Sequence, residues 1–212
     1  MNSSEPDSRR RVGTAMLWIG SAALALVAAL AIPLGLRTSG VGPATAPLIG
    51  RTSVTQRATE VGLARSRPIH LSIPALGVSV PLSSLGLNAD GTVSVPTDFN
   101  VPGWYKFDAS PGQMGTAVIL GHVDSYRGPA VFFNLRSLKV GDRVIVTLAD
   151  HRAARFAVIG TATYLKARFP ARLVYGRRSY SALQLVTCGG VFDHATGSYL
   201  SNVVVYTARV TS

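Results

Sequence analysis

The chain opens with a long uncharged apolar stretch and continues with short apolar runs separated by turns. Residues 12–36 carry no charged side chain and are rich in Ala and Leu. About 20 helical residues, each rising roughly 1.5 Å, cross the hydrocarbon core of a bilayer. Arg9, Arg10 and Arg11 precede the stretch, and Arg37 alone follows it closely. By the positive-inside rule, this pattern predicts a cytoplasmic N-terminus at 1–11 and a single transmembrane signal anchor, with the rest of the chain outside the cell.

A cleavable signal peptide is the alternative for this stretch. The apolar region of a signal peptide usually spans about 7–15 residues, so the longer run favours an uncleaved anchor. Small residues near Ala29 and Ala31 keep cleavage open. Residues 37–66 then change in character, because Gly, Pro, Ser and Thr dominate and no apolar period persists. That composition predicts a flexible linker between the anchor and the remainder of the chain.

The apolar runs of residues 67–212 predict β-strands. Between Ile69 and Ile73, apolar residues alternate with polar ones, as in a half-buried strand. Short runs rich in β-branched residues follow at 117–120, 143–148, 156–159, 183–187 and 203–206. The pair Asp90-Gly91 is typical of a hairpin turn. The spacing of these runs predicts an all-β barrel or sandwich, with short helical turns only near 132–138 and 172–175.

The chain is strongly basic, which fits an anionic environment, but the distribution of its basic residues argues against a nucleic-acid partner. The formal net charge is +11 at pH 7. The basic residues are dispersed along the chain, and no zinc-ligand spacing, ribonucleoprotein motif or helix-turn-helix pattern accompanies them. An exposed basic domain beside an anionic membrane or cell wall fits this composition.

Two potentially reactive residues stand where predicted strands end. His122 follows the run 117–120 after Gly121, and Cys188, the only cysteine, follows the run 183–187 and precedes Gly189-Gly190. A thiolate is a strong nucleophile that a nearby imidazole can activate. Glycines after the cysteine let a carbonyl approach and leave backbone N–H groups for an oxyanion. This pairing predicts nucleophilic catalysis by Cys188 with His122 as the acid and base.

Cys188 and His122 are each compatible with another assignment. Cys188 taken alone is compatible with a small buried apolar side chain, and His122 with a hydrogen-bonded structural residue. His194, in the loop after Cys188, is the reserve histidine. The scattered histidines and single cysteine predict no metal site, and we expect no cofactor. A papain-like protease has its cysteine before its histidine, which is the wrong order here. Residues 185–190 also lack the serine, glycine and arginine that surround the cysteine of an L,D-transpeptidase.

At these residues the chain resembles the sortase family. The matching segments are Gly121–Ser125, the pair Thr187-Cys188, and Thr196-Gly197 ahead of a last strand over 202–206. Segments 73–78, 128–133 and 188–190 further resemble the actinobacterial sortases called class F. The resemblance covers residues 67–212. It implies an eight-stranded sortase-like β-barrel preceded by one transmembrane helix.

The resemblance also implies an activity. A sortase is a cysteine transpeptidase that recognises an LPXTG-like C-terminal sorting signal on secreted proteins. Cys188 would attack the threonine carbonyl of the signal and form a thioacyl enzyme. His122 would protonate the leaving amine and deprotonate the incoming one, which in the family belongs to a cell-wall peptide or a pilin; metal is not required. The alternative is a non-catalytic, membrane-tethered β-domain that binds wall or protein partners, with Cys188 buried and unreactive.

One position departs from the sortase pattern. Sortases usually place an arginine at the start of the last strand, and here that position is Asn202. Asparagine donates neutral hydrogen bonds but brings no positive charge. Either Asn202 suffices together with backbone donors, or another arginine reaches the site, or the protein is inactive. The arginines considered for that role are Arg127, Arg168, Arg177 and Arg178.

The sequence also predicts the roles or positions of three further side chains. Asp124 lies two residues after His122, where it can orient the imidazole or hold its own loop. Trp104 and Tyr105 precede the histidine strand, and we expect them in the core or on the barrel rim rather than against a substrate.

Overall fold

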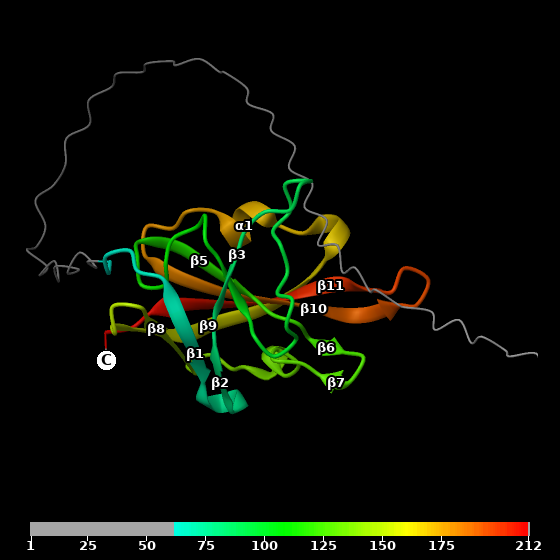
Figure 1. Ribbon diagram of the computed structural model, residues 1–212, viewed down its shortest axis with the longest axis horizontal. Helices are drawn as coiled ribbons and strands as arrows, with labels where there is room; N and C mark the ends of the chain where they lie inside the picture. The colour runs from blue at the N-terminus through cyan, green and yellow to red at the C-terminus, as the bar shows by residue number, and fades with distance from the viewer. Residues whose placement is uncertain (1–61, 212) are drawn as a thin grey trace, which may run out of the picture.

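Strand pairing in residues 62–211, the part that the computed structural model describes, produces a nine-stranded sheet curled into a nearly closed barrel (Figure 1). The strand order is β2-β1-β8-β9-β11-β10-β5-β4-β3. The strands are β1 (Pro68–Ile73), β2 (Val78–Pro81), β3 (Ser83–Leu85), β4 (Gly103–Tyr105), β5 (Gly115–Leu120), β8 (Arg143–Leu148), β9 (Ala153–Leu165), β10 (Ser181–Asp193) and β11 (Ser198–Arg209). The remaining elements are a two-stranded sheet of β6 (Asp124–Ser125) and β7 (Gly128–Pro129), the 3-10 turns η1 (Pro74–Leu76), η2 (Leu135–Ser137) and η3 (Lys166–Arg168), and the short helix α1 (Ala171–Tyr175).

The two edge strands of the sheet belong to one extended stretch of chain. β2 pairs with β1, and the backbone N–H of Leu82 continues that pairing by donating to the Ile69 carbonyl at 2.9 Å. From Ser83 onward the stretch turns to the opposite edge, where β3 pairs with β4. The all-β prediction is confirmed, but the predicted number of eight strands is wrong. This stretch divides at Leu82 into two strands with different partners, and alternation in the sequence does not show such a division.

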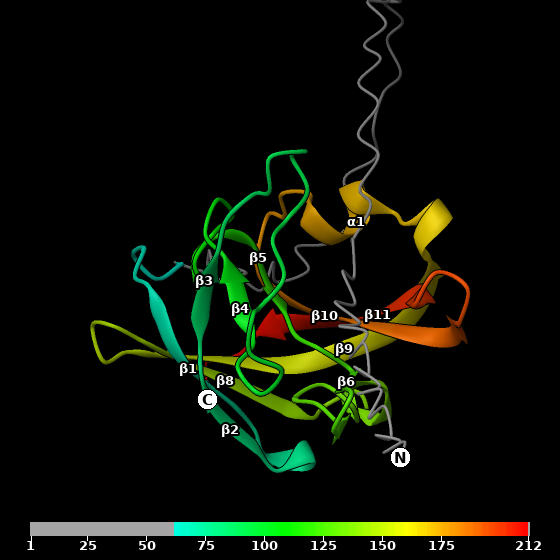
Figure 2. The same ribbon diagram turned by 45° about the vertical axis from the view of Figure 1, so that its right-hand side comes forward.

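In β10, and in its neighbour β5, side chains on both faces of the sheet are buried. Leu183 and Leu185 of β10 point into the barrel core, whereas Val186 belongs to a second apolar cluster on the outer face. Because alternate residues of a strand point to opposite faces, a strand covered on both sides reads as a continuous apolar run. α1 and η3 lie against the outer face, next to β5 and β11 respectively (Figure 2).

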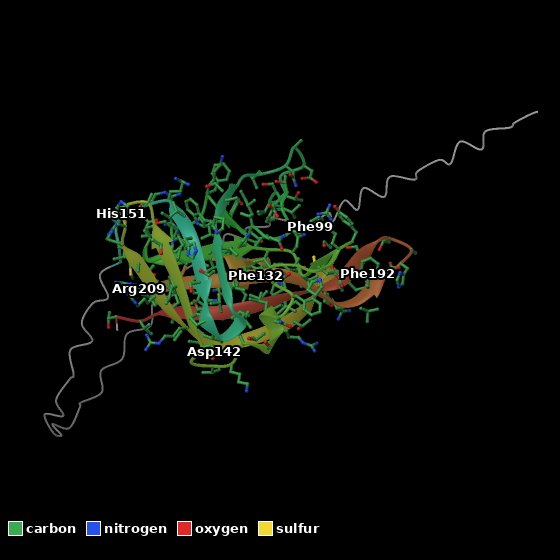
Figure 3. All side chains as sticks on the ribbon, turned by 60° about the horizontal axis from the view of Figure 1, so that its bottom comes forward. Phe99, Phe132, Asp142, His151, Phe192 and Arg209 are labelled. Carbon is green, nitrogen blue, oxygen red and sulfur yellow. The ribbon has the colours of Figure 1, made fainter. Side chains whose placement is uncertain are left out.

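Large aromatic side chains from β4 and from the loop before η2 fill gaps in the hydrophobic packing of the barrel. Phe132 is fully buried among residues of the core (Figure 3). Trp104 is 4% exposed, and its indole Nε1 donates to the Ala109 carbonyl at 3.0 Å. Tyr105, the next residue, packs partly buried against the outer cluster. Both aromatic side chains therefore lie where the sequence predicted them.

The chain joins the domain before the first strand. Leu63 packs against the barrel core and its N–H donates to the Gly112 carbonyl at 2.8 Å. The predicted cytoplasmic segment 1–11, the predicted anchor at 12–36 and the first part of the predicted linker, 37–61, lie outside the described residues. Within residues 62–211, no helix has the length and apolar character needed to cross a membrane.

Candidate active site

Cys188 lies on the outer face of β10, just beyond the point where β5 ends. Val186 pairs with Leu120, the last residue of β5, and Cys188 pairs with Asn202 of β11. Since Val186 faces the outer cluster, Cys188, two residues further on, lies on that same face of the sheet. The pairing of β10 with β5 ends at Leu120, and the side chain of Cys188 is half-buried. The thiol is therefore held by a rigid strand but remains accessible.

The glycines after Cys188 form a bulge in β10. Gly189 pairs with Ser201 and the next pair joins Phe192 to Tyr199, so the register shifts between them. Gly190 has φ +81°, in the region that favours glycine, and a Cβ there would lie 2.9 Å from the Ser201 hydroxyl oxygen. The bulge redirects the end of the β10–β11 hairpin. Gly190 is thus required by the backbone itself, independently of any role toward a substrate.

His122 is positioned by a tight contact behind it. A Cβ on Gly121 would lie 2.5 Å from the Phe132 ring, so this position accepts no side chain without a shift. The Phe132 N–H donates to the His122 carbonyl at 2.9 Å. On the imidazole, Nε2 lies 2.7 Å from the Pro96 carbonyl oxygen, and the ring centroid lies 4.7 Å from that of Phe99. A carbonyl only accepts, so Nε2 carries a proton and Nδ1 remains for proton exchange.

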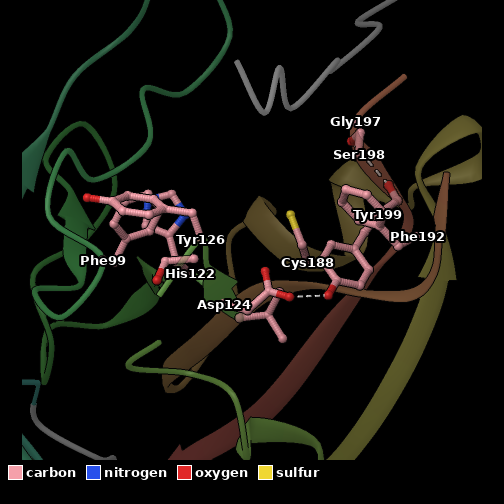
Figure 4. Close-up of a pocket in the computed structure, with 11 residues that line it drawn as sticks. Phe99, His122, Asp124, Tyr126, Cys188, Phe192, Gly197, Ser198 and Tyr199 are labelled. Carbon is pink, nitrogen blue, oxygen red and sulfur yellow. Dashed lines mark hydrogen bonds between the residues drawn. The ribbon is translucent and has the colours of Figure 1, made fainter. Parts of the chain in front are cut away.

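One cavity contains both predicted catalytic residues. It has a volume of about 350 Å³ and is lined by residues from the segment after β5, from β10 and from the start of β11. Figure 4 shows His122 with Phe99 and Tyr126 on one wall, and Cys188 with Tyr199 on the other. A smaller cavity beside Pro96 also touches His122 and Cys188. The structure thus brings these two residues, far apart in sequence, to one solvent-accessible space.

The surroundings of Cys188 favour a protonated thiol at rest. Burial raises the pKa of Cys188 above its ordinary value, and the Asp124 carboxylate raises it further. The Lys166 ammonium opposes both, because its positive charge favours the thiolate. Because the pKa of Cys188 is raised, the thiol must lose a proton during the reaction. His122, in the same cavity, is a base that can accept this proton.

Asp124 is engaged by a tyrosine. Its carboxylate accepts a hydrogen bond from the Tyr199 hydroxyl, which ties β6 to the start of β11 (Figure 4). This bond, with a contribution from burial, raises the pKa of Tyr199 to about 12. Between Asp124 and His122 the described part of the chain has no hydrogen bond. Of the two roles considered for Asp124, the structure favours a structural one.

Replacing Asp124 by Asn should make the Cys188 thiol more acidic, because the carboxylate charge disfavours the thiolate. We expect alkylation of Cys188 by iodoacetamide to become roughly two- to three-fold faster at pH 7, a change well below one pKa unit. The measurement is the alkylation rate as a function of pH. Tyr199→Phe, which removes the hydrogen bond but keeps the charge, is the control. A slower reaction in Asp124→Asn would contradict the prediction.

Asn202 lies within β11, directly beside Cys188. It pairs with Cys188 on one side and with Tyr164 of β9 on the other. The side chain is 2% exposed, and its Oδ1 has no hydrogen-bond partner. Asn202 therefore brings a neutral amide to the site and no positive charge.

Within the described residues, none of the four arginines considered for that charge lines the cavities at Cys188. Arg127 stacks on the exposed Tyr126 ring at 5.1 Å, and Arg178 donates to the Leu173 carbonyl at 2.8 Å. Arg177 borders a separate polar pocket near the start of β5, and Arg168 is exposed on η3. His194 is also exposed, at the tip of the β10–β11 hairpin.

Two cations near the site were missed from the sequence. Lys166 acts directly on the Cys188 thiol, and Arg136 lines a further cavity of about 540 Å³ that also borders Cys188. Lys166 is 22 positions away from Cys188 and belongs to none of the motifs. Only the lateral order of the strands brings its side chain to the thiol.

Comparison with known proteins adds a family to this geometry. The family model for the sortase domain matches residues 71–210. Among solved structures, sortase A from Corynebacterium diphtheriae superimposes with a TM-score of 0.51 at 20% identity, covering 70% of this chain and 63% of that one. A sortase D5 transpeptidase from Clostridium perfringens superimposes with a TM-score of 0.50 at 19% identity, covering 68% of this chain and 79% of that one. Sortase C1 from Streptococcus agalactiae superimposes with a TM-score of 0.51 at 18% identity, covering 76% of this chain and 73% of that one. No curated protein matches the chain. At these identities the structures support the shared fold.

Proposed function

Because the chain belongs to the sortase family of cysteine transpeptidases, we propose that it cleaves a sorting signal on a secreted protein and transfers the acyl part to an amine. The observation that supports this most directly is the cavity shared by Cys188 and His122. We further propose an LPXTG-like signal and an acceptor amine from a cell-wall peptide or a pilin. On this proposal the enzyme resembles class F sortases, residues 12–36 anchor it in the membrane, and the barrel works outside the cell.

The first half-reaction forms a thioacyl enzyme. The Cys188 proton passes to His122, and the thiolate attacks the carbonyl carbon of the scissile peptide bond, forming a C–S bond. As the C–N bond breaks, the imidazolium gives its proton to the departing amine. The hydrogen bond from Nε2 to the Pro96 carbonyl stabilises the protonated imidazole in this step, because the carbonyl oxygen carries partial negative charge.

The second half-reaction transfers the acyl group. The incoming amine attacks the thioester carbon and loses a proton to His122, a new C–N bond forms, and the C–S bond breaks. The Cys188 thiolate that leaves takes back the proton, which restores the starting state. No net oxidation or reduction occurs in either step.

The cavity walls suit an extended peptide with apolar side chains. Phe99, Tyr126 and Phe192 present aromatic surface on either side of the thiol. Tyr126 is 81% exposed and Phe192 39% exposed, so both rings have surface that a bound peptide can cover. Burial of these rings by the substrate would contribute to binding through the hydrophobic effect.

Mass spectrometry of the full-length protein tests the proposal. Incubation with a panel of peptides carrying LPXTG-like sequences should give a covalent adduct on Cys188, with loss of the residues after the scissile bond. Hydroxylamine, a small amine nucleophile, should release the adduct as a hydroxamate. Cys188→Ala should give neither product while keeping its circular dichroism spectrum.

The competing hypothesis of a binding module predicts different results. A folded protein that forms no adduct with any peptide, and whose thiol resists iodoacetamide, would reject the transpeptidase. The half-buried position of Cys188 on an open cavity already argues against a thiol that serves only as core filling.

A further inference from the structure

The proposed reaction places negative charge on the Cys188 sulfur twice, when the thiol is deprotonated and when the thiolate leaves the acyl group. Burial and the Asp124 carboxylate both disfavour that charge. Asn202, in the usual arginine position, is neutral. A sortase built on this site therefore needs a cation from elsewhere in the fold.

Lys166 occupies the position that can provide this cation. It follows directly after β9, whose last residues pair with β11 in the pairs Tyr164–Asn202 and Leu165–Ser201. Since Asn202 in turn pairs with Cys188, the end of β9 lies level with the thiol and one strand beyond Asn202. Lys166 can therefore reach Cys188 from the end of β9, past the short amide of Asn202.

The Lys166 side chain is oriented toward the cavity by a hydrogen bond. Its Nζ donates to the Ser198 hydroxyl at 2.8 Å, in a partly buried setting, and Ser198 lines the same cavity as Cys188. The charge of the ammonium lowers the pKa of the Cys188 thiol. One of its three N–H donors is thus bound to a residue that lines the site, which holds the ammonium on the Cys188 side of β11.

The other charged groups around the thiol do not replace Lys166. Asp124 is negative and bonded to Tyr199. His122 stands on the opposite wall (Figure 4), and Arg136 lines a different cavity, which also borders Cys188 but not Ser198. Among residues 62–211, Lys166 has no carboxylate partner within ion-pair distance, so its charge is not neutralised by a neighbouring acid. Part burial weakens solvent screening, which strengthens its action on the sulfur.

We propose that Lys166 stabilises the Cys188 thiolate and takes the place of the arginine that sortases usually carry at the position of Asn202. This inference rests on the proposed function for its catalytic meaning. The effect of Lys166 on the ionisation of the thiol does not require a substrate. An ammonium is a compact point charge without the planar, bidentate geometry of a guanidinium. It is therefore suited to a single sulfur atom.

Thiol alkylation in the full-length protein is the test. Lys166→Met should move the pH profile of iodoacetamide alkylation to higher pH and slow the reaction at pH 7 by roughly tenfold, the effect expected for loss of one close opposite charge. Lys166→Arg should restore the rate to within about threefold, because it keeps the charge. In a peptide assay the loss in Lys166→Met should fall mainly on kcat, since the charge acts on the reacting sulfur.

Matched variants separate the charge from structural effects. Arg168→Met removes a positive charge from the exposed end of the same 3-10 turn and should leave alkylation unchanged. Ser198→Ala removes the orienting hydrogen bond and should have a smaller effect than Lys166→Met. If Lys166→Met does not fold, Lys166→Gln, a polar neutral side chain, carries the same test.

The outcomes are distinguishable from those of the proposed function. A normal alkylation profile in folded Lys166→Met would overturn the inference, even if peptides still form adducts on Cys188. A shift produced by Arg136→Met instead would assign the charge to the other cavity and overturn it as well. If no peptide reacts but Lys166→Met still shifts the profile, the role of Lys166 toward the thiolate stands and only the transpeptidase proposal fails.

Discussion

His122→Ala should slow peptide transfer by about 10²–10⁴-fold, the usual contribution of a positioned acid–base group. The loss has two sources in the proposed mechanism. Without the imidazole, the proposed mechanism has no base to take the Cys188 proton, and the upward-shifted pKa of the thiol keeps the thiolate scarce at neutral pH. The departing amine also loses its proton donor. The measurement is kcat/KM for cleavage of the best peptide and for transfer to hydroxylamine.

A second histidine provides the control for this experiment. His194 lies close in sequence to Cys188 but is exposed on the hairpin, where its ring contacts Phe192 with centroids 5.1 Å apart. His194→Ala should therefore keep most of the activity. Full activity in His122→Ala, or a loss confined to His194→Ala, would show that a different group handles the protons.

The sequence predicted the strands well where both faces of the sheet are covered. The run 117–120 is continuously apolar because Ile119 packs into the barrel and Val118 into the outer cluster. The error in the number of strands arises at Leu82, where a single extended stretch changes partner from β1 to β4. Alternation of polar and apolar residues is the same on both sides of such a change, since it reports the faces of a strand and not its neighbours.

The sequence pattern predicted only part of the site. Cys188 and His122 stood out because each lies where an apolar run meets glycine, a local pattern that marks a strand end. Lys166 gave no such signal, since it is related to Cys188 through the pairing of Tyr164 with Asn202 and of Asn202 with Cys188. The partner of Asp124, Tyr199, is 75 positions away for the same reason. Contacts that cross a sheet laterally depend on strand order, and strand order is a property of the whole fold.

The position of His122 depends on packing as much as on sequence pattern. Gly121 leaves room for the Phe132 ring, and Phe132 in turn bonds through its N–H to the His122 carbonyl. The ring is part of the barrel core. A core side chain therefore connects the stability of the barrel to the placement of the catalytic histidine, and a change in that side chain should be visible in both.

Phe132→Ala should lower the free energy of unfolding by about 3–5 kcal/mol, the usual cost of removing a buried phenylalanine and leaving a cavity. The ring is fully buried, so little solvent can enter to compensate. The neighbouring Phe133, 49% exposed, provides a matched control of the same chemistry. Phe133→Ala should change stability by less than about 1 kcal/mol.

Urea unfolding of the full-length protein, followed by tryptophan fluorescence, checks this comparison, because Trp104 lies in the same core. Phe132→Ala should also lower kcat under conditions where the variant is still folded, since the void beside Gly121 loosens the segment that carries His122. Alkylation of Cys188 should remain within about threefold of the wild-type rate, because that segment acts on the thiol pKa through the charge of Asp124, whose effect is small. Equal destabilisation by the two phenylalanine variants would show that Phe132 has no special place in the core. A stability loss without any change in kcat would separate the packing of Phe132 from the positioning of His122.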